Sequence, residues 1–235
     1  MQLIPRAQQG QLQHSSWSYG ASVNGLPLRG FGPRKASPDL LIMAAMHGDE
    51  ADTVLVLSEA LRQVPETHMA NPVILNVNPD GVLNGTRCNA RGIDLNRNYP
   101  ADNWAPDTVH HRSSAGEAQD IELSPGNVPG SEPETQALIA LIEELQPRIV
   151  VTLHSALGCI DDPDATRLGH WVSQQVNLEV VPDVGYPTPG SFGSWARERE
   201  RPVLTWELPA HSIPELRKSH VPVLIKLITG DYPAL

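Results

Sequence analysis

The chain has 235 residues, a length typical of one domain, and its 40% hydrophobic and 19% charged residues are typical of a soluble globular protein rather than a disordered one. Lysine and arginine number 17 against 27 aspartate and glutamate, so the net charge is −10, which argues against a nucleic-acid or anionic-membrane partner. The longest apolar run, residues 40–46, is too short to span a membrane.

The beginning of the chain is predicted to carry little regular structure. Residues 1–38 are rich in Gly, Pro, Ser and Gln, and they predict an irregular lead-in to a single domain that spans residues 1–235. The first ten residues contain one arginine and no apolar segment, so we expect no secretory signal and a cytoplasmic location. Two cysteines are too few for a disulfide framework and are expected to be free thiols.

Short apolar runs alternate with helical patterns along the rest of the chain. Buried strands are predicted at residues 40–46, 72–78, 148–154, 178–181 and 202–207. Helices are predicted at residues 49–63, after residue 131 and at residues 214–228. Strands that alternate with helices predict an α/β fold in which helices cover both faces of a sheet.

Residues 78–131 show no strong period, and a loop of that length in a compact domain is usually functional or disordered. The loop begins with Asn78-Pro-Asp-Gly81, which is typical of a turn. It ends with Ser131-Glu-Pro-Glu134, which predicts a capping box at the next helix.

Three arginines, Arg87, Arg91 and Arg97, lie close together in this loop. A guanidinium binds carboxylates through two parallel hydrogen bonds and can polarise a carbonyl group. The arginines therefore favour a substrate-binding loop, with a solvated basic loop as the alternative.

Histidine and glutamate residues follow three of the predicted strands. His47 and Glu50 follow the first strand, His154 ends the strand at 148–154, and Glu207 ends the strand at 202–207. Ligands bind at the carboxyl ends of the strands in open parallel sheets, so these side chains are expected to meet. Three protein ligands with an open fourth position are typical of catalytic zinc, and the remaining glutamate would be free to act as a general base. Taken singly, each residue could equally be a buried or solvated side chain with no such role.

The ordered set of these motifs resembles the zinc carboxypeptidases. The set comprises His47-x-x-Glu50, Asn78-Pro-Asp-Gly81, Arg87 followed by Gly92-Ile-Asp-Leu-Asn-Arg-Asn98, Ser131-Glu-Pro-Glu-Thr135, His154 and Thr205-Trp-Glu207. The resemblance implies a mixed, mostly parallel eight-stranded sheet flanked by helices, with one Zn²⁺ per chain. It assigns His47, Glu50 and His154 as zinc ligands and Glu207 as the general base.

The resemblance also implies roles around the metal. Arg87, with Arg91 as the alternative, matches the arginine that stabilises the oxyanion. Asp94 matches the acid that orients the first histidine. The further substrate contacts that it implies are Asn96, Arg97, Tyr186, Ser191 and Phe192, of which Asn96 and Arg97 match the pair that binds the terminal carboxylate.

Further runs resemble a group of short members of this family. The runs begin at Ala101, Pro129, Cys159 and Val184. That group hydrolyses the γ-D-glutamyl–meso-diaminopimelate bond of murein peptides during cell-wall recycling. The resemblance therefore implies the tripeptide L-Ala-γ-D-Glu-meso-diaminopimelate as substrate. Arg112, a further arginine of the long loop, is a candidate for the distal carboxylate, with a surface position as the alternative. Asp161 and Asp162 are further candidates for the pocket.

Other functions are kept as alternatives. A general metallocarboxypeptidase and an N-acyl amino acid deacylase would need the same residues. A binding module without a metal would be expected to lack a ligand or the glutamate, and this sequence retains all four. We expect no nucleic-acid or membrane partner, and a homodimer is the assembly to be tested against a monomer.

Overall fold

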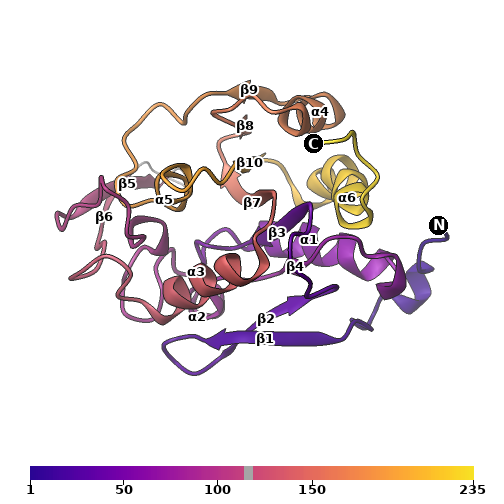
Figure 1. Cartoon of the computed structure of the whole chain (residues 1–235), viewed down its shortest axis with the longest axis horizontal. Coiled ribbons are helices and arrows are strands. Elements are labelled where there is room, and N and C mark those ends of the chain that lie inside the picture. The colour runs from indigo at the N-terminus through magenta and orange to yellow at the C-terminus, as the bar shows by residue number, and fades with distance from the viewer. Residues whose placement is uncertain (114–118) are drawn as a thin grey trace.

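The structure is a computed structural model that describes residues 1–113 and 119–235, with only the backbone described at 110–113 and 119–120 (Figure 1). The strands in this part of the chain are β1 (Ser16–Ala21), β2 (Pro27–Phe31), β3 (Leu40–Ala44), β4 (Val73–Ile74), β5 (Val109–Ser113), β6 (Gln119–Leu123), β7 (Ile149–Ala156), β8 (Cys159–Asp161), β9 (Glu179–Val181) and β10 (Val203–Pro209). The α-helices are α1 (Ala51–Gln63), α2 (Pro79–Asn84), α3 (Pro133–Leu145), α4 (Arg167–Val176), α5 (Phe192–Arg197) and α6 (Ile213–Thr229). Short 3-10 helices are η1 (Arg6–Gln8), η2 (Glu66–His68) and η3 (Leu95–Arg97).

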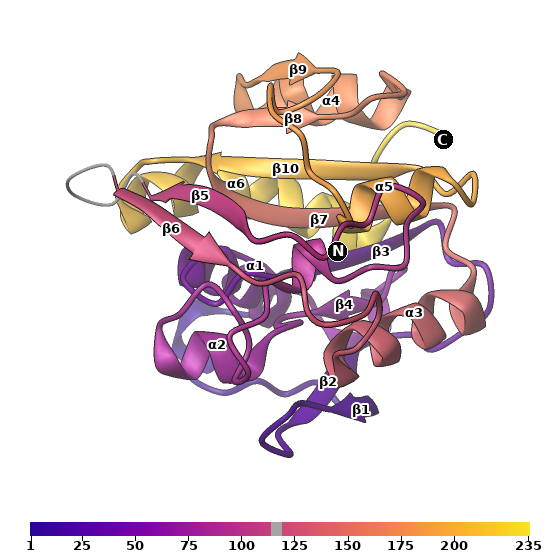
Figure 2. The same cartoon turned by 90° about the vertical axis from the view of Figure 1, so that its left-hand side faces the viewer.

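Eight strands form one mixed sheet in the order β1-β2-β4-β3-β7-β10-β8-β9, which Figure 2 shows from one edge to the other. The pairs β4–β3, β3–β7, β7–β10 and β8–β9 are parallel, and the other pairs are antiparallel. The predicted mixed, mostly parallel eight-stranded sheet flanked by helices is therefore confirmed. Strands β5 and β6 form a separate antiparallel pair.

The lead-in prediction for residues 1–38 is wrong, because this segment contains β1 and β2. Its apolar residues are sparse, and the strands are stabilised by their place at one edge of the sheet. Strand β2 pairs with β4 through Phe31 and Val73. Because this pairing joins residues that are far apart in the sequence, the residues of β2 alone could not predict it.

Helices cover both faces of the sheet, and side chains of successive strand residues enter opposite layers. Leu40 and Ile42 of β3 pack in the layer that includes α1, α4 and α6. Leu41 and Met43 pack in the layer that includes α3 and α5. The continuous apolar run at residues 40–46 is thus explained by a strand that is buried on both faces.

The predicted elements differ from the structure mainly at their ends. The second strand is shorter than predicted, because β4 comprises only Val73–Ile74. The predicted turn at Asn78 is instead the start of α2, whose first turn is capped by the Asn78 side chain accepting from the Gly81 N–H at 2.9 Å. The sequence analysis missed α4, α5 and β8.

The predicted capping box at Ser131 and Glu134 is also wrong. The N-cap of α3 is Glu132, and no side chain caps this helix. Glu134 instead accepts hydrogen bonds from the Val23 N–H and from Asn89, so it anchors two other segments. A capping box does form at Ser212 and Glu215 in the first turn of α6.

Among the described residues, every helix is too short or too polar to cross a membrane.

Candidate active site

His47, Glu50 and His154 meet at the carboxyl end of the central strands. His47 follows β3, Glu50 is the N-cap of α1, and His154 lies near the end of β7. His47 Nδ1 lies 2.7 Å from Glu50 Oε1 and 3.2 Å from His154 Nδ1, and His154 Nδ1 lies 3.0 Å from Glu50 Oε2. All three are buried, and their ligand atoms lie within 4.8 Å of one another.

This donor set fits a catalytic metal. Two imidazole nitrogens and one carboxylate, with no fourth protein ligand in the group, form the donor set of hydrolytic zinc sites that keep one position open. The separations between the Nδ1 atoms and the carboxylate oxygens are short enough for one ion to bridge them. The three residues could therefore hold a divalent metal between them.

The electrostatics of the group match a cation site. Burial raises the pKa of Glu50, but the facing imidazoles of His47 and His154 outweigh burial and hold this pKa far below its usual range. Burial and Arg87 lower the pKa of His47, whereas Glu50 and Asp94 raise it, with a net result of about 9. The carboxylates thus stabilise positive charge at this point, which a metal ion would also carry.

Glu207 lies beside His47, Glu50 and His154, the three candidate ligands that form the metal-ligand group. Strand β10 runs parallel to β7, and Glu207 is in register with His154. Burial raises the pKa of Glu207, and the neighbouring His154 partly offsets this effect. Its Oε2 is buried without a hydrogen-bond partner among the described residues. A buried carboxyl with a raised pKa and a free oxygen is suited to accept a proton.

Arg87 and Asp94 lie on the other side of His47. Asp94 is completely buried, and its Oδ1 lies 3.3 Å from His47 Nε2. The Arg87 Nε donates to Asp94 Oδ2 at 3.2 Å, and its Nη2 lies 2.9 Å from His47 Nε2. Asp94 is therefore placed to orient the imidazole, as a carboxylate behind a metal-bound histidine does.

Arg87 and its alternative Arg91 occupy different environments. Arg87 lines the cavity next to the metal-ligand group, and its side chain is only 10% exposed. The Arg91 side chain is 55% exposed and pairs with Glu132 at 3.5 Å. Geometry therefore favours Arg87 as the arginine that meets a reacting carbonyl.

Asn96 and Arg97 project into the same cavity from η3. Asn96 Oδ1 accepts from the Phe192 N–H at 2.9 Å, which ties η3 to α5. Arg97 is buried, its Nε has no described partner, and burial lowers its pKa. A buried guanidinium with a free N–H is suited to an anionic ligand such as a carboxylate.

Glycine at position 48 allows the turn that carries His47 and Glu50 to pack closely against α2. A Cβ atom at Gly48 would lie 2.1 Å from the Gly81 carbonyl carbon and 2.4 Å from the Thr86 oxygen. The Gly48 N–H donates to the Arg87 carbonyl oxygen at 3.1 Å. The absence of a side chain at Gly48 therefore lets the turn carrying His47 and Glu50 approach the segment carrying Arg87.

The predicted substrate contacts in residues 186–192 divide into two groups. Tyr186 and Ser191 line the cavity; Tyr186 is 49% exposed, and Ser191 caps α5 by accepting from the Ser194 N–H at 3.1 Å. The prediction for Phe192 is wrong, because its ring is buried against Tyr99 and Trp195 and is not part of the lining. Phe192 is the first residue of α5, and its side chain turns to the core.

The prediction for Arg112 falls on a side chain outside the described part of the structure. Its backbone lies in β5, in register with Asp120. A role for Arg112 stays a prediction.

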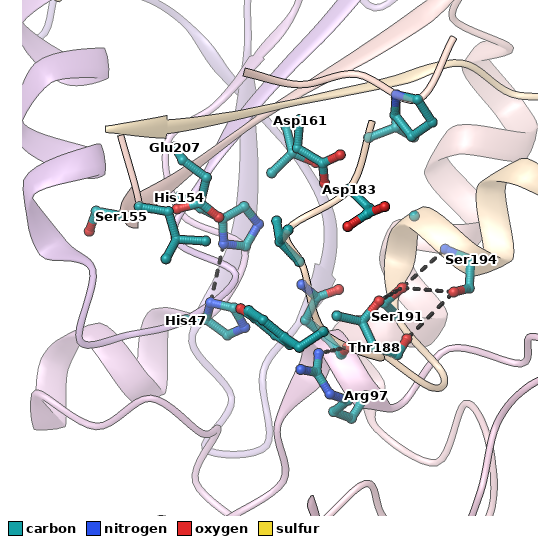
Figure 3. A pocket seen from close by; sticks show the side chains of 18 of the residues that line it. His47, Arg97, His154, Ser155, Asp161, Asp183, Thr188, Ser191, Ser194 and Glu207 are labelled. Atoms are coloured by element: carbon teal, nitrogen blue, oxygen red, sulfur yellow. Dashed lines mark hydrogen bonds between the residues drawn. The ribbon is translucent and has the colours of Figure 1, made fainter. Parts of the chain in front are cut away.

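A cavity of about 530 Å³ joins the candidate metal ligands, Glu207, Arg87 and the segment of Asn96 and Arg97, and it has lining residues that the sequence analysis missed (Figure 3). These include Asp183, Thr188, Arg197, Arg201 and Thr205. Asp161 lines the cavity, whereas Asp162 caps the turn before α4 by accepting from Thr166. Val203 and Thr205 could have been found from the sequence, because they alternate with Glu207 along one strand face.

The fold and the histidine–glutamate group define a metal-dependent hydrolase of the α/β class, and comparison with known proteins agrees. A family model described as zinc carboxypeptidase matches residues 15–161. The chain belongs to the zinc carboxypeptidase family.

Individual relatives are similar over almost the whole chain. Murein peptide amidase A of Escherichia coli (strain K12) is 44% identical over 226 residues, which cover 95% of this chain and 93% of the relative. The crystal structure of murein-tripeptide amidase MpaA from Escherichia coli O157 superposes with a TM-score of 0.92 at 43% identity, covering 97% of this chain and 98% of that one. Carboxypeptidase A from Helicoverpa armigera shares the fold, with a TM-score of 0.69 at 16% identity, over 93% of this chain and 68% of that one.

Proposed function

We propose that this chain is a zinc-dependent amidase that hydrolyses the γ-D-glutamyl–meso-diaminopimelate bond of murein peptides in cell-wall recycling. The single observation that carries the proposal is the meeting of His47, Glu50 and His154 beside the unpaired carboxyl of Glu207. Similarity over the whole chain to murein peptide amidases supports this choice of substrate.

His47, Glu50 and His154 would hold the zinc ion. When bound, zinc lowers the pKa of a water molecule towards ~7 and polarises the scissile carbonyl. The residues around it are arranged for the remaining tasks of amide hydrolysis.

Glu207 accepts the proton of the attacking water at Oε2 as the oxygen–carbon bond forms. It then returns this proton to the amine nitrogen of diaminopimelate as the carbon–nitrogen bond breaks. The products are free diaminopimelate and the dipeptide L-Ala-D-Glu with a new γ-carboxylate. Burial raises the pKa of Glu207 towards neutral pH, and a carboxyl with such a pKa both accepts and returns a proton more readily.

The arginines bind the charged parts of the substrate. Arg87 donates N–H groups to the oxygen that becomes negative in the tetrahedral intermediate. Arg97 and Asn96 hold the carboxylate beside the reacting amine, which places the amide bond next to Glu207. Tyr186 and Ser191 contact the substrate from the segment before α5.

The proposal is tested with purified, zinc-loaded protein and the tripeptide L-Ala-γ-D-Glu-meso-diaminopimelate. We expect release of diaminopimelate, detected by mass spectrometry, and loss of this release when a chelator removes the metal. A peptide with an ordinary α-linked C-terminal residue and an N-acyl amino acid are the comparison substrates. Preferential hydrolysis of either would identify a general metallocarboxypeptidase or a deacylase instead.

The proposal includes a cytoplasmic location, since a recycling enzyme acts on peptides that have entered the cell. A homodimer remains a prediction, and light scattering of the purified chain tests it directly.

A further inference from the structure

The cavity extends beyond the reacting centre along one face of β10. Val203, Thr205 and Glu207 alternate on this strand and all line the cavity. Each step of two residues is about 7 Å long, so Thr205 lies about that far from Glu207. On the other edge of β10, Asp161 of β8 is in register with Thr205. Asp161 is therefore one such step along the sheet, and one strand across, from the general base.

Charged groups of both signs line this part of the cavity. Asp161 and Asp183 point towards it, beside the segment that carries Ser191 and Ser194 (Figure 3). Arg197, at the end of α5, and Arg201 line the same cavity. No step of the proposed hydrolysis uses these four side chains.

These charges are incompletely paired. Asp161 Oδ1 is buried and has no hydrogen-bond partner among the described residues. Burial and the nearby Asp183 raise the pKa of Asp161 to about 6, and Arg197 partly offsets this rise. In the described part of the chain, the Arg197 guanidinium forms no salt bridge within 4.0 Å to a carboxylate. A ligand with an ammonium and a carboxylate would pair both groups, whereas an apolar ligand would leave two charges unpaired.

We propose that Asp161 and Arg197 form a subsite for a zwitterionic amino-acid group at the far end of the departing residue. Asp161 accepts hydrogen bonds from the ammonium, and Arg197 donates to the carboxylate. This inference rests on the proposed function and names the residues that select its substrate. It assigns the distal carboxylate to Arg197 rather than to Arg112.

The distance along the cavity suits diaminopimelate. Four carbon–carbon bonds separate its two amino-acid centres, which span roughly 5 Å when each bond is about 1.5 Å. When Arg97 holds one amino-acid centre beside the reacting bond, the other centre extends along the cavity to the position of Asp161. Inversion of the distal centre would exchange the positions of ammonium and carboxylate, so the subsite also selects its configuration.

The test pairs two variants with three substrates that differ only in the departing residue. The residues are meso-diaminopimelate, L-lysine, which lacks the distal carboxylate, and L-2-aminopimelate, which lacks the distal amine. We expect Asp161→Asn to lower kcat/KM about 10- to 100-fold with diaminopimelate and lysine but not with aminopimelate. Arg197→Gln should produce the same loss with diaminopimelate and aminopimelate but not with lysine.

Binding of free meso-diaminopimelate, measured by calorimetry, provides a readout that needs no turnover. Each variant should weaken this binding at least about tenfold. The exposed residues Asp107 and Arg167 do not line the cavity, so Asp107→Asn and Arg167→Gln are matched controls and should bind normally.

Two results would overturn the subsite. An equal loss on all three substrates would indicate a structural role, and unchanged use of diaminopimelate would place its distal centre elsewhere. If the wild-type protein cleaves none of the γ-D-glutamyl substrates, the proposed function fails. The calorimetric comparison would still decide whether Asp161 and Arg197 bind the zwitterion.

Discussion

Several charged side chains that line the cavity hold buried polar atoms without hydrogen-bond partners among the described residues. Glu207 Oε2 and Arg97 Nε are both buried, and neither has a hydrogen-bond partner among the described residues. An unpaired buried polar atom is costly, so its presence in a cavity indicates a partner that arrives with the ligand. The attacking water and the substrate carboxylate supply these partners in the proposed reaction.

Substitution of Glu207 by glutamine separates metal binding from proton transfer. The amide is nearly the same size as the carboxyl but cannot accept the proton, so we expect kcat to fall about 10²- to 10⁴-fold. Zinc content, measured by atomic absorption, should stay at the wild-type level because Glu207 is outside the ligand group. A variant with near-normal turnover would remove Glu207 from the role of base.

Asp94→Asn tests the carboxylate behind His47. The amide keeps the shape but loses the charge that orients the imidazole, and we expect zinc affinity to fall about 10- to 100-fold. Competition with a chromogenic chelator measures this affinity, with Asp107→Asn as the control on an exposed carboxylate. If the zinc affinity of Asp94→Asn were unchanged, Asp94 would not orient His47, and its role would be to hold Arg87.

At the scale of the elements, the local sequence does not predict which side chains cap a helix and which bind a distant segment. Ser131 and Glu134 have the spacing of a capping box, yet Glu134 binds Val23 and Asn89 instead. The α4 helix, which sequence analysis missed, is capped by Thr166, whose Oγ1 accepts from the Gly169 N–H at 3.0 Å. Thr166 also donates to the buried Asp162 at 2.7 Å, which fixes the turn after β8.

Thr166→Ala should therefore destabilise the protein by about 1 kcal/mol, the usual cost of a lost N-cap. Denaturant unfolding measures this difference. Thr166→Ser retains the hydroxyl and should recover most of the stability. Gln174→Ala, on the exposed face of the same helix, is the matched control and should change little. An equal loss in the serine variant would point to the threonine methyl group rather than the cap.

At the scale of the whole molecule, the metal-ligand group joins segments that are far apart in the chain. His154 is separated from Glu50 by 104 residues, and the group sits where β3, α1 and β7 meet. A metal that binds the folded protein and not the unfolded chain stabilises the fold by mass action.

We expect zinc at 100 times its dissociation constant to add about 2.7 kcal/mol to the free energy of unfolding, and a chelator to reverse this gain. Thermal unfolding at increasing zinc concentrations measures the effect. His154→Ala should lose the zinc-dependent shift, whereas His170→Ala, at an exposed histidine of α4, should keep it. A shift that persists in His154→Ala would place the stabilising metal at another site.

The sequence alone determined the positions where the main site residues follow strands, because apolar runs and the polar residues that end them are local signals. His47 could be placed after a buried strand, and His154 and Glu207 could be placed at the ends of two others. The parallel order of β3, β7 and β10 brings the three together. The alternating helices and strands likewise sufficed for the fold class.

Only the tertiary structure decided the features that depend on contacts between distant segments. The pairing of β2 with β4, the pairing of Arg91 with Glu132 and the burial of Phe192 against Tyr99 all depend on neighbours far along the chain. The opposed charges of Asp161 and Arg197 line one cavity for the same reason, because the fold places β8 and α5 on either side of it. Local patterns predict which residues are buried or polar, and the folded chain determines which of them are neighbours.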